Sequence, residues 1–293
     1  MSDAPMTAQS IIDNILHPSD FSDAGRVAFA HALKAALVTR SVLTLVHVAQ
    51  PNESVDWGDF PGVRETLERW GLLPHGSRKV DVAKLGIEVK KHVGHDSDPV
   101  RSVLHYLETH PTDLIVLAAS HHEGRMRWLR KSVAEPLARK SGQMTLLVPE
   151  GVQGFVSLDD GSVSLKSILI PVATSPLAQP AVTGAARLVR RLGIPAGTFT
   201  LLSVGGPGPI DKLFRPELQG WTWQTRTPSG DVTSRILEAA DEVDADLIAM
   251  VTTGHHGFLD ALRGSTSEQV LRLAACPLLA VPEHSLAAGA LHM

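Results

Sequence analysis

The chain contains the same segment twice. Residues 112–150 align without a gap with residues 245–283 when 133 is added to each number. The start of the unit recurs as well, since residues 15–18 (ILHP) return as residues 168–171 (ILIP). The agreeing pairs include Asp113/Asp246, His122/His255, Gly124/Gly257, Ser132/Ser265 and Pro149/Pro282. They gather where strands and helices would begin or end, which indicates a tandem duplication of one folding unit.

Length and composition agree with two domains. A chain of 293 residues provides two units of roughly 100–200 residues, each able to bury its own core. A net charge of −4 does not favour a nucleic-acid partner. The single cysteine, Cys276, fits a reducing compartment. No apolar run reaches the roughly 20 residues of a membrane span, and the N-terminus lacks signal-peptide features. We therefore expect a cytoplasmic protein with no membrane partner.

Strands and helices are predicted to alternate in each half. In the first half, short apolar runs predict strands at 11–16, 42–48, 85–93, 114–119 and 144–148, and helical periodicity predicts helices at 24–38, 100–110 and 131–140. In the second half, the predicted strands are 168–172, 199–204, 221–226, 247–252 and 278–281. This alternation predicts the α/β class, with parallel sheets and right-handed crossovers.

The domain boundaries follow from composition. We predict a first domain at 8–150, a linker at 151–165 rich in Gly, Ser and Asp, a second domain at 166–284 and a tail at 285–293. Insertions at 51–79 and 205–220 are the least shared parts of the two halves. Val148 and Val281 lie on closing strands whose edges need a partner. We expect the halves to pack face to face as an internal pseudo-dimer.

Ligands of open α/β sheets bind at the carboxyl ends of the strands. In the second half, Gly254 and Gly257 follow the fourth strand, and Gly264, Ser265 and Thr266 precede the next helix. Glycines allow close approach of a ligand to the backbone, and a helix N-terminus attracts phosphate. A second interpretation stays open, in which the glycines only turn the chain and Ser265 only caps the helix.

Two segments resemble the signatures of the universal stress protein family. The first is residues 15–22 (ILHPSDFS), and the second runs from residues 246–248 (DLI) through Gly254-x-x-Gly257 to residues 276–282 (CPLLAVP). The resemblance covers most of both halves and implies two Rossmann-like (adenine nucleotide alpha hydrolase-like) domains. Each would be a five-stranded parallel sheet with helices on both faces, associating through its last strand as a pseudo-dimer or homodimer. For one branch of the family it implies ATP or AMP binding without an established catalytic cycle.

The resemblance also assigns ligand-binding positions. Asp20 occupies the place of an acidic residue that contacts the adenosine part, and its counterpart in the second half is Ala173. Val48 and Val93 fall near positions that line the adenine pocket. The expected phosphate-binding positions are Gly254, Gly257, Gly264, Ser265 and Thr266 in the second half, and Gly124 and Ser132 in the first. The loop of the second half is shorter than usual in the family, and Lys131 replaces its later glycine in the first half. Each half thus keeps one part of the site.

The chain has 14 histidines, several of them at predicted strand ends. The candidates for a zinc site are His17, His47, His95, His121 and His122. Their spacing matches no compact metal motif, so the interpretation as solvated or structural histidines stays open.

Three functions are compatible with these residues. The first is a stress-response binding or interaction protein with an adenine nucleotide ligand, and the second is a nucleotide-hydrolysing enzyme on the same fold. The enzyme would need an acid to hold a metal beside the phosphates, and only Asp260 is near the glycine loop. The third is a histidine-based metal-binding protein. We favour the first, and no catalytic residue is assigned.

Overall fold

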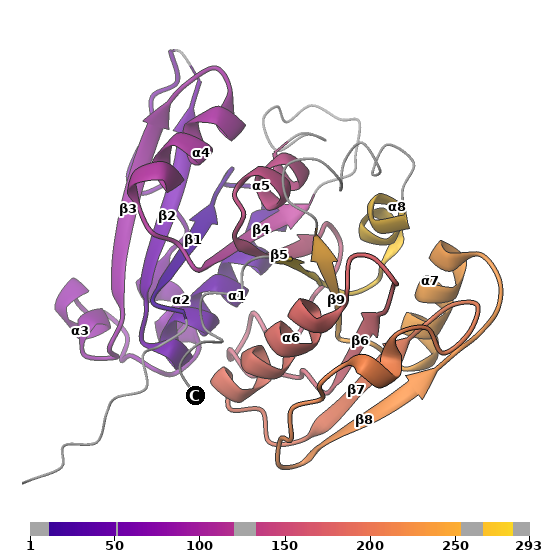
Figure 1. Cartoon of the computed structure of the whole chain (residues 1–293). Coiled ribbons are helices and arrows are strands. Elements are labelled where there is room, and N and C mark those ends of the chain that lie inside the picture. The colour runs from indigo at the N-terminus through magenta and orange to yellow at the C-terminus, as the bar shows by residue number, and fades with distance from the viewer. Residues whose placement is uncertain (1–11, 51, 120–132, 253–265, 284–293) are drawn as a thin grey trace, which may run out of the picture.

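Ten strands form the framework of the protein, seen in a computed structural model that describes residues 12–50, 52–119, 133–252 and 266–283 (Figure 1). The first half contributes β1 (Asn14–Pro18), β2 (Val42–Ala49), β3 (Glu88–His95), β4 (Leu114–Ala119) and β5 (Met144–Pro149). The second half contributes β6 (Ser167–Pro171), β7 (Gly197–Leu202), β8 (Trp221–Arg226), β9 (Leu247–Thr252) and β10 (Leu278–Pro282). The predicted strand at 221–226 is confirmed as β8.

The ten strands form one sheet in the order β3-β2-β1-β4-β5-β10-β9-β6-β7-β8, with β3 and β8 at its two ends (Figure 1). Within each half all five strands are parallel, and the two halves have the same strand order reflected about the centre. β4 is apolar along its whole length, and β9 is apolar up to Thr252, because helices cover both faces of the sheet. The duplicated five-stranded α/β unit is therefore confirmed.

The helices divide between the two faces of the sheet. Their bounds are α1 (Asp23–Thr39), α2 (Val63–Arg69), α3 (Lys79–Ala83), α4 (Pro99–Thr109), α5 (Ala134–Lys140), α6 (Gln179–Arg191), α7 (Val232–Glu242) and α8 (Thr266–Leu273), with a short 3-10 turn at Ile210–Lys212. One apolar cluster, called the α1/α6 cluster below, joins the sheet to α1, α2, α3 and α6. A second cluster joins the sheet to α4, α5, α7 and α8. No helix of the described ranges is both long enough and apolar enough to span a bilayer.

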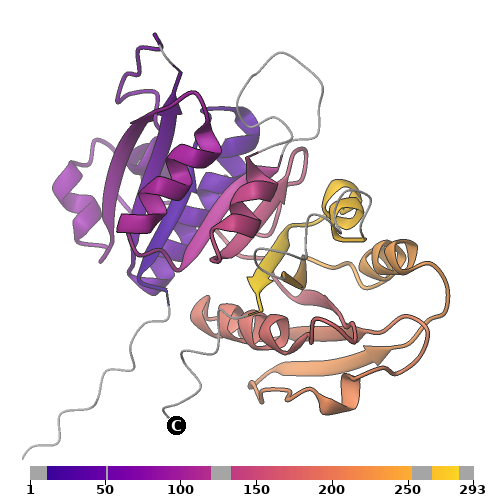
Figure 2. The ribbon, with the colours of Figure 1, turned by 45° about the horizontal axis from the view of Figure 1, so that its top comes forward.

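The halves meet edge to edge, and the expected face-to-face packing is wrong. β5 and β10 pair antiparallel, with Leu146 opposite Leu279 and Thr145 opposite Ala280. Figure 2 shows the two halves side by side along this seam. The pairing satisfies the backbone N–H and C=O groups that each closing strand would otherwise leave open at its edge. The α1/α6 cluster contains both Leu146 and Leu279, so the hydrophobic core continues across the seam.

The segment predicted as a linker, residues 151–165, packs on the first half. Phe155 is buried, and its ring lies edge-on to the His31 ring at 4.6 Å. Its backbone N–H donates to His31 Nε2 at 3.1 Å. Farther along, the carbonyl oxygen of Leu158 accepts hydrogen bonds from Arg69 Nε at 2.8 Å and from Trp70 Nε1 at 3.1 Å. These contacts hold residues 151–165 against α1 and α2.

Gly161→Ala is expected to weaken the packing of residues 151–165 against the first half. Gly161 has φ +67°, and an added Cβ would lie 2.5 Å from Trp70 Cδ2. Trp70 is buried and bonded to Leu158, so it cannot move aside cheaply. We expect the free energy of unfolding to fall by about 2–5 kcal/mol, the sum of left-handed strain and overpacking. Urea denaturation measures this change.

Gly151→Ala is the matched control. Gly151 has φ +81°, and no atom outside its chain neighbours lies within 4 Å of the added Cβ. This variant carries the backbone cost alone, about 1–2 kcal/mol. Equal losses in the two variants would show that contact with Trp70 does not explain the effect at Gly161.

Candidate ligand-binding site

The sheet register aligns the two halves residue by residue. Pro18 pairs with Val46 in the first half, and Pro171 pairs with Leu202 in the second. Counting onward from these pairs makes Ala173 the counterpart of Asp20, Thr174 that of Phe21, and Ser203 that of His47. The same strand-end positions therefore carry different side chains in the two halves.

A cavity of about 710 Å³ lies at the carboxyl ends of β6, β7 and β9 in the second half. Its walls come from the loop after β6, the loop after β7, the first turns of α7 and the first residue of α8. Residues of all these elements line it, including Ala173, Thr174, Ser203, Gly205, Gly206, Val232, Ile236, Met250 and Thr266. This is the position where open α/β sheets bind ligands, and the volume is typical of small-molecule sites.

A glycine-rich stretch forms one wall of the cavity. Gly205 and Gly206 follow β7 with φ angles of +88° and +138°, which side-chain-bearing residues rarely adopt. A Cβ on either would meet nothing within 4 Å, so their backbone is open to a ligand. Neither glycine is among the residues predicted from the sequence to bind a ligand, because both lie in the insertion 205–220, which the two halves do not share. The available signal was a glycine pair directly after a predicted strand.

The described lining of the cavity is neutral. Among its described lining residues no side chain carries a charge, and the polar groups are the hydroxyls of Thr174, Ser175, Ser203 and Thr266 together with the backbone. Val204, Ile236 and Met250 supply apolar contact. Such a lining can hold a flat ring by van der Waals contact and orient polar substituents by neutral hydrogen bonds.

The predicted phosphate-binding residues fall largely outside the described part of the chain. This applies to Gly124 and Ser132 in the first half, and to Gly254, Gly257, Gly264 and Ser265 in the second. Among the described residues near 253–265, Val251 and Thr266 both line the cavity.

The strand ends of the first half carry bulkier side chains. Phe21 and His47 stack with their ring centroids 4.1 Å apart, where the second half has the small hydroxyl residues Thr174 and Ser203. Asp20 is engaged locally: its Oδ1 accepts hydrogen bonds from the backbone N–H of Ser22 at 3.0 Å and from Ser22 Oγ at 2.6 Å. The first half thus keeps the acidic residue, and aromatic packing occupies the neighbouring positions.

The two valines assigned to the adenine pocket lie on opposite faces of the sheet. Val48 belongs to the cluster beneath α4 and α5, and Val93 packs against the α1/α6 cluster. The structure does not bring them together on one surface. Val204, the counterpart of Val48 by register, lines the second-half cavity.

The candidate metal ligands are dispersed or engaged. His17 is buried, and its Nδ1 bonds the carbonyl oxygen of Val116 at 2.9 Å. His47 is buried too, with Nδ1 bonded to the carbonyl oxygen of Ser19 at 2.8 Å and Nε2 near a Glu53 carboxylate oxygen at 3.2 Å. His95 is exposed at the end of β3, and His121 and His122 lie outside the described residues. Within the described ranges, no group of three or more His, Cys, Asp or Glu side chains could hold a metal ion.

Comparison with known proteins places the chain in a family. The profile of the Universal stress protein family matches residues 12–149 and 213–282. Universal stress protein A homolog 1 of Coxiella burnetii is 46% identical over 55 residues, which cover 19% of this chain and 38% of that protein. Universal stress protein Sll1654 of Synechocystis is 30% identical over 142 residues, which cover 42% of this chain and 88% of that protein. The match thus spans less than two thirds of the Coxiella relative.

A solved structure extends the similarity to nearly the whole chain. The crystal structure of a universal stress protein from Archaeoglobus fulgidus superposes with a TM-score of 0.61 at 20% identity, covering 94% of this chain and 99% of that one. The chain belongs to the universal stress protein family, with two tandem units of the Rossmann-like, adenine nucleotide alpha hydrolase-like fold.

Proposed function

We propose that this protein is a stress-response binding protein that holds an adenine nucleotide, ATP or AMP, in the strand-end cavity of its second half. The observation that carries the proposal is a cavity of about 710 Å³ that includes Gly205, Gly206 and Thr266 and whose described lining is neutral. Its place at the carboxyl ends of parallel strands and the family membership support the same conclusion. The proposal assigns binding and no chemical step, because the described lining offers no carboxylate or imidazole as a general base.

The same proposal includes the organisation of the chain. We place the two domains at 8–150 and 166–284, joined by residues 151–165, in a cytoplasmic protein. Pairing of β5 with β10 uses, inside one chain, the strand edge through which two separate copies would associate. A homodimer of this protein would therefore use another surface, such as the sheet edges at β3 or β8.

Ligand content is the direct test. Mass spectrometry of small molecules released from freshly purified protein should detect an adenine nucleotide, and calorimetric titration with ATP and AMP should give a saturable isotherm. Absence of both results would contradict the proposal. Turnover of magnesium-ATP above about one per minute would instead favour the nucleotide-hydrolysing enzyme.

Two substitutions at one position test where the nucleotide binds. Ala173 is exposed and lines the cavity, so it accepts new side chains without repacking. Ala173→Asp supplies the acidic residue that the first half retains at Asp20, and we expect roughly tenfold tighter binding of ATP through a charged hydrogen bond to the adenosine part. Ala173→Trp places an indole in the cavity and should weaken binding about tenfold or more.

Leu177→Trp is the matched control for the blocking variant. Leu177 lies on the same loop and is 52% exposed, but it is not among the residues that line the cavity. We expect unchanged ATP affinity. A loss equal to that of Ala173→Trp would attribute the effect to the loop rather than to the cavity.

A further inference from the structure

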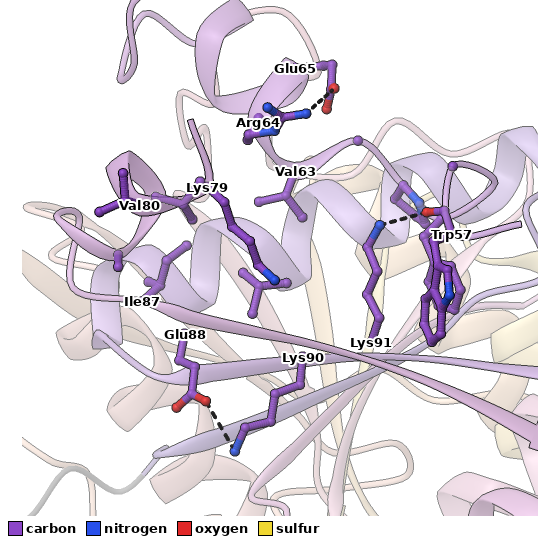
Figure 3. Close-up of a pocket in the computed structure, with 17 residues that line it drawn as sticks. Trp57, Val63, Arg64, Glu65, Lys79, Val80, Ile87, Glu88, Lys90 and Lys91 are labelled. Atoms are coloured by element: carbon purple, nitrogen blue, oxygen red, sulfur yellow. Dashed lines mark hydrogen bonds and ion pairs between the residues drawn. The ribbon is translucent and has the colours of Figure 1, made fainter. Parts of the chain in front are cut away.

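A large open groove lies beside edge strand β3, in the first half and apart from the strand-end cavity. It measures about 1480 Å³ and is bounded by the loop before α2, by α2 and α3, and by residues 87–91 (Figure 3). That volume exceeds the roughly 300–1,000 Å³ of sites for small molecules. Much of its wall is the insertion at 51–79, which the second half does not share. The groove is therefore a property of this half rather than of the repeated unit.

One side of the groove is β3, whose outer edge pairs with no other strand of the described ranges. In β2, the backbone N–H of Val42 donates to the Asp13 carbonyl oxygen, and the backbone C=O of Val46 accepts from the N–H of Ser19, both on the side of β1. Backbone groups of successive strand residues point to opposite edges, so the N–H and C=O of Leu43 face β3. Leu43 pairs with Val89, and in a parallel ladder its two bonds go to the residues on either side of Val89. The N–H and C=O groups of Val89, and of Lys91 two residues on, therefore point away from β2. Both residues line the groove.

The groove carries excess positive charge. Its lining contains four cationic side chains, Arg64, Lys79, Lys90 and Lys91, and two carboxylates, Glu65 and Glu88. Both carboxylates lie beside a cation, Glu65 at 3.6 Å from Arg64 and Glu88 at 3.5 Å from Lys90. Within the described residues, Lys79 and Lys91 have no carboxylate within 4.0 Å. Lys79 and Lys91 are therefore available to form ion pairs with a negatively charged ligand.

The two lysines approach the groove from different elements. Figure 3 shows Lys79 extending from α3 toward β3, and Lys91 extending from β3 toward Trp57. Lys91 Nζ donates to the Trp57 carbonyl oxygen at 2.9 Å and lies 5.1 Å from the centre of the Phe60 ring. Burial lowers the pKa of Lys91 from its usual value, and a carboxylate arriving nearby would favour its charged form.

Apolar surface accompanies these charges. Trp57 is 58% exposed and stacks on Phe60 with ring centroids 5.7 Å apart. Val80 on α3 is also exposed and lines the groove. A strand adding at this edge would present side chains alternately to its two faces, so it could offer carboxylates and apolar groups in turn.

We propose that this groove binds an extended acidic segment of a partner protein, which pairs with β3 as an added strand. Backbone hydrogen bonds to Val89 and Lys91 provide the pairing, and carboxylates of the segment lie near Lys79 and Lys91. Trp57 and Val80 receive its apolar side chains. The size of the groove, the open strand edge and the unmatched lysines together favour a peptide over a small anion.

Fluorescence anisotropy tests the proposal with a fluorescein-labelled peptide of about ten alternating Glu and Val residues. We expect saturable binding that weakens with added salt, and no binding of a Lys/Val peptide of equal length. The Glu/Val peptide methylated on all of its backbone nitrogens should not bind, because neither of its edges can donate hydrogen bonds to the ladder. Hydrogen exchange should report new protection at the amides of Val89 and Lys91.

Charge variants complete the test. Lys79 is exposed, so Lys79→Glu should fold normally and weaken peptide binding roughly tenfold, and Lys79→Gln should have a smaller effect. Lys212→Glu makes the same charge change on an exposed residue of the second half and should leave binding unchanged. Equal binding of the methylated peptide, an unchanged affinity in Lys79→Glu, or displacement of the peptide by pyrophosphate would overturn the proposal. ATP binding at the strand-end cavity is measured separately and does not affect this outcome.

Discussion

Replacing Leu279 with aspartate is expected to lower the free energy of unfolding by about 4 kcal/mol or more. Leu279 is fully buried on β10 and lies opposite Leu146 of β5, at the junction of the two halves. The α1/α6 cluster that surrounds it is apolar, so the carboxylate would be buried without a partner or would have to become neutral. Urea denaturation followed by circular dichroism measures the loss.

Hydrogen exchange in β5 tests whether its pairing with β10 couples the two halves. Hydrogen exchange at residues 145–147 of β5 should accelerate in Leu279→Asp, although the substitution lies in the other half of the chain. Leu273→Asp is the control, since Leu273 is 58% exposed on α8 and the same chemical change there should cost less than about 0.5 kcal/mol. Disturbed exchange confined to β10, with β5 unaffected, would mean that the seam does not couple the halves.

The repeated pattern predicted most of the strands because a strand buried on both faces is a short apolar run with sharp ends. The prediction failed where a turn contains apolar residues. Strand 85–93 was predicted to begin at Leu85, but β3 begins at Glu88. The N–H groups of Leu85 and Gly86 bond back to Val82 and Ala83, and Gly86 has φ +84°. These residues end α3 instead of starting the strand.

The first strand shows a second kind of error. It was predicted at 11–16 because Pro18 was treated as a boundary, whereas β1 runs to Pro18 itself. Proline lacks an N–H but keeps its C=O, so it is tolerated as the last residue of a strand. Neither error changes the strand order.

The candidate site was less predictable because it depends on pairs of residues from different strands. The sequence pattern places a ligand site at the carboxyl ends of the strands but does not indicate which half contains the open cavity. The offset between the halves is 153 from Pro18 to Pro171 and 156 from Val46 to Leu202, so the two loops come into correspondence only through the sheet register. In that alignment, the large rings of Phe21 and His47 in the first half correspond to the small hydroxyl residues Thr174 and Ser203 in the second half.

Acidification from pH 7 to pH 5 is expected to destabilise the protein by about 4 kcal/mol. Burial lowers the pKa of His17 and that of His31 to about 4, from 6.5 in an unfolded chain. His31 Nε2 accepts the N–H of Phe155, which requires the neutral ring. The unfolded chain binds a proton at each site below about pH 6.5, and the folded protein does so only near pH 4. The contribution of these two histidines to the free energy of unfolding is therefore complete above pH 6.5 and is lost as the pH falls toward 4. At pH 5 about 2 kcal/mol per histidine has been lost.

His31→Gln separates this effect from other titrations. Glutamine offers Phe155 an acceptor oxygen but takes up no proton, so the loss of stability between pH 7 and pH 5 should fall by about half, as measured by urea denaturation at each pH. Asp96 and Asp160, whose pKa values are lowered to about 2, lose their contribution only at more acidic pH. The control is His105→Gln, which makes the same chemical change on an exposed residue of α4 and should not halve the loss. Equal stability at pH 7 and pH 5 in the unmodified protein would rule out buried neutral imidazoles, and an undiminished loss in His31→Gln would remove His31 as a source.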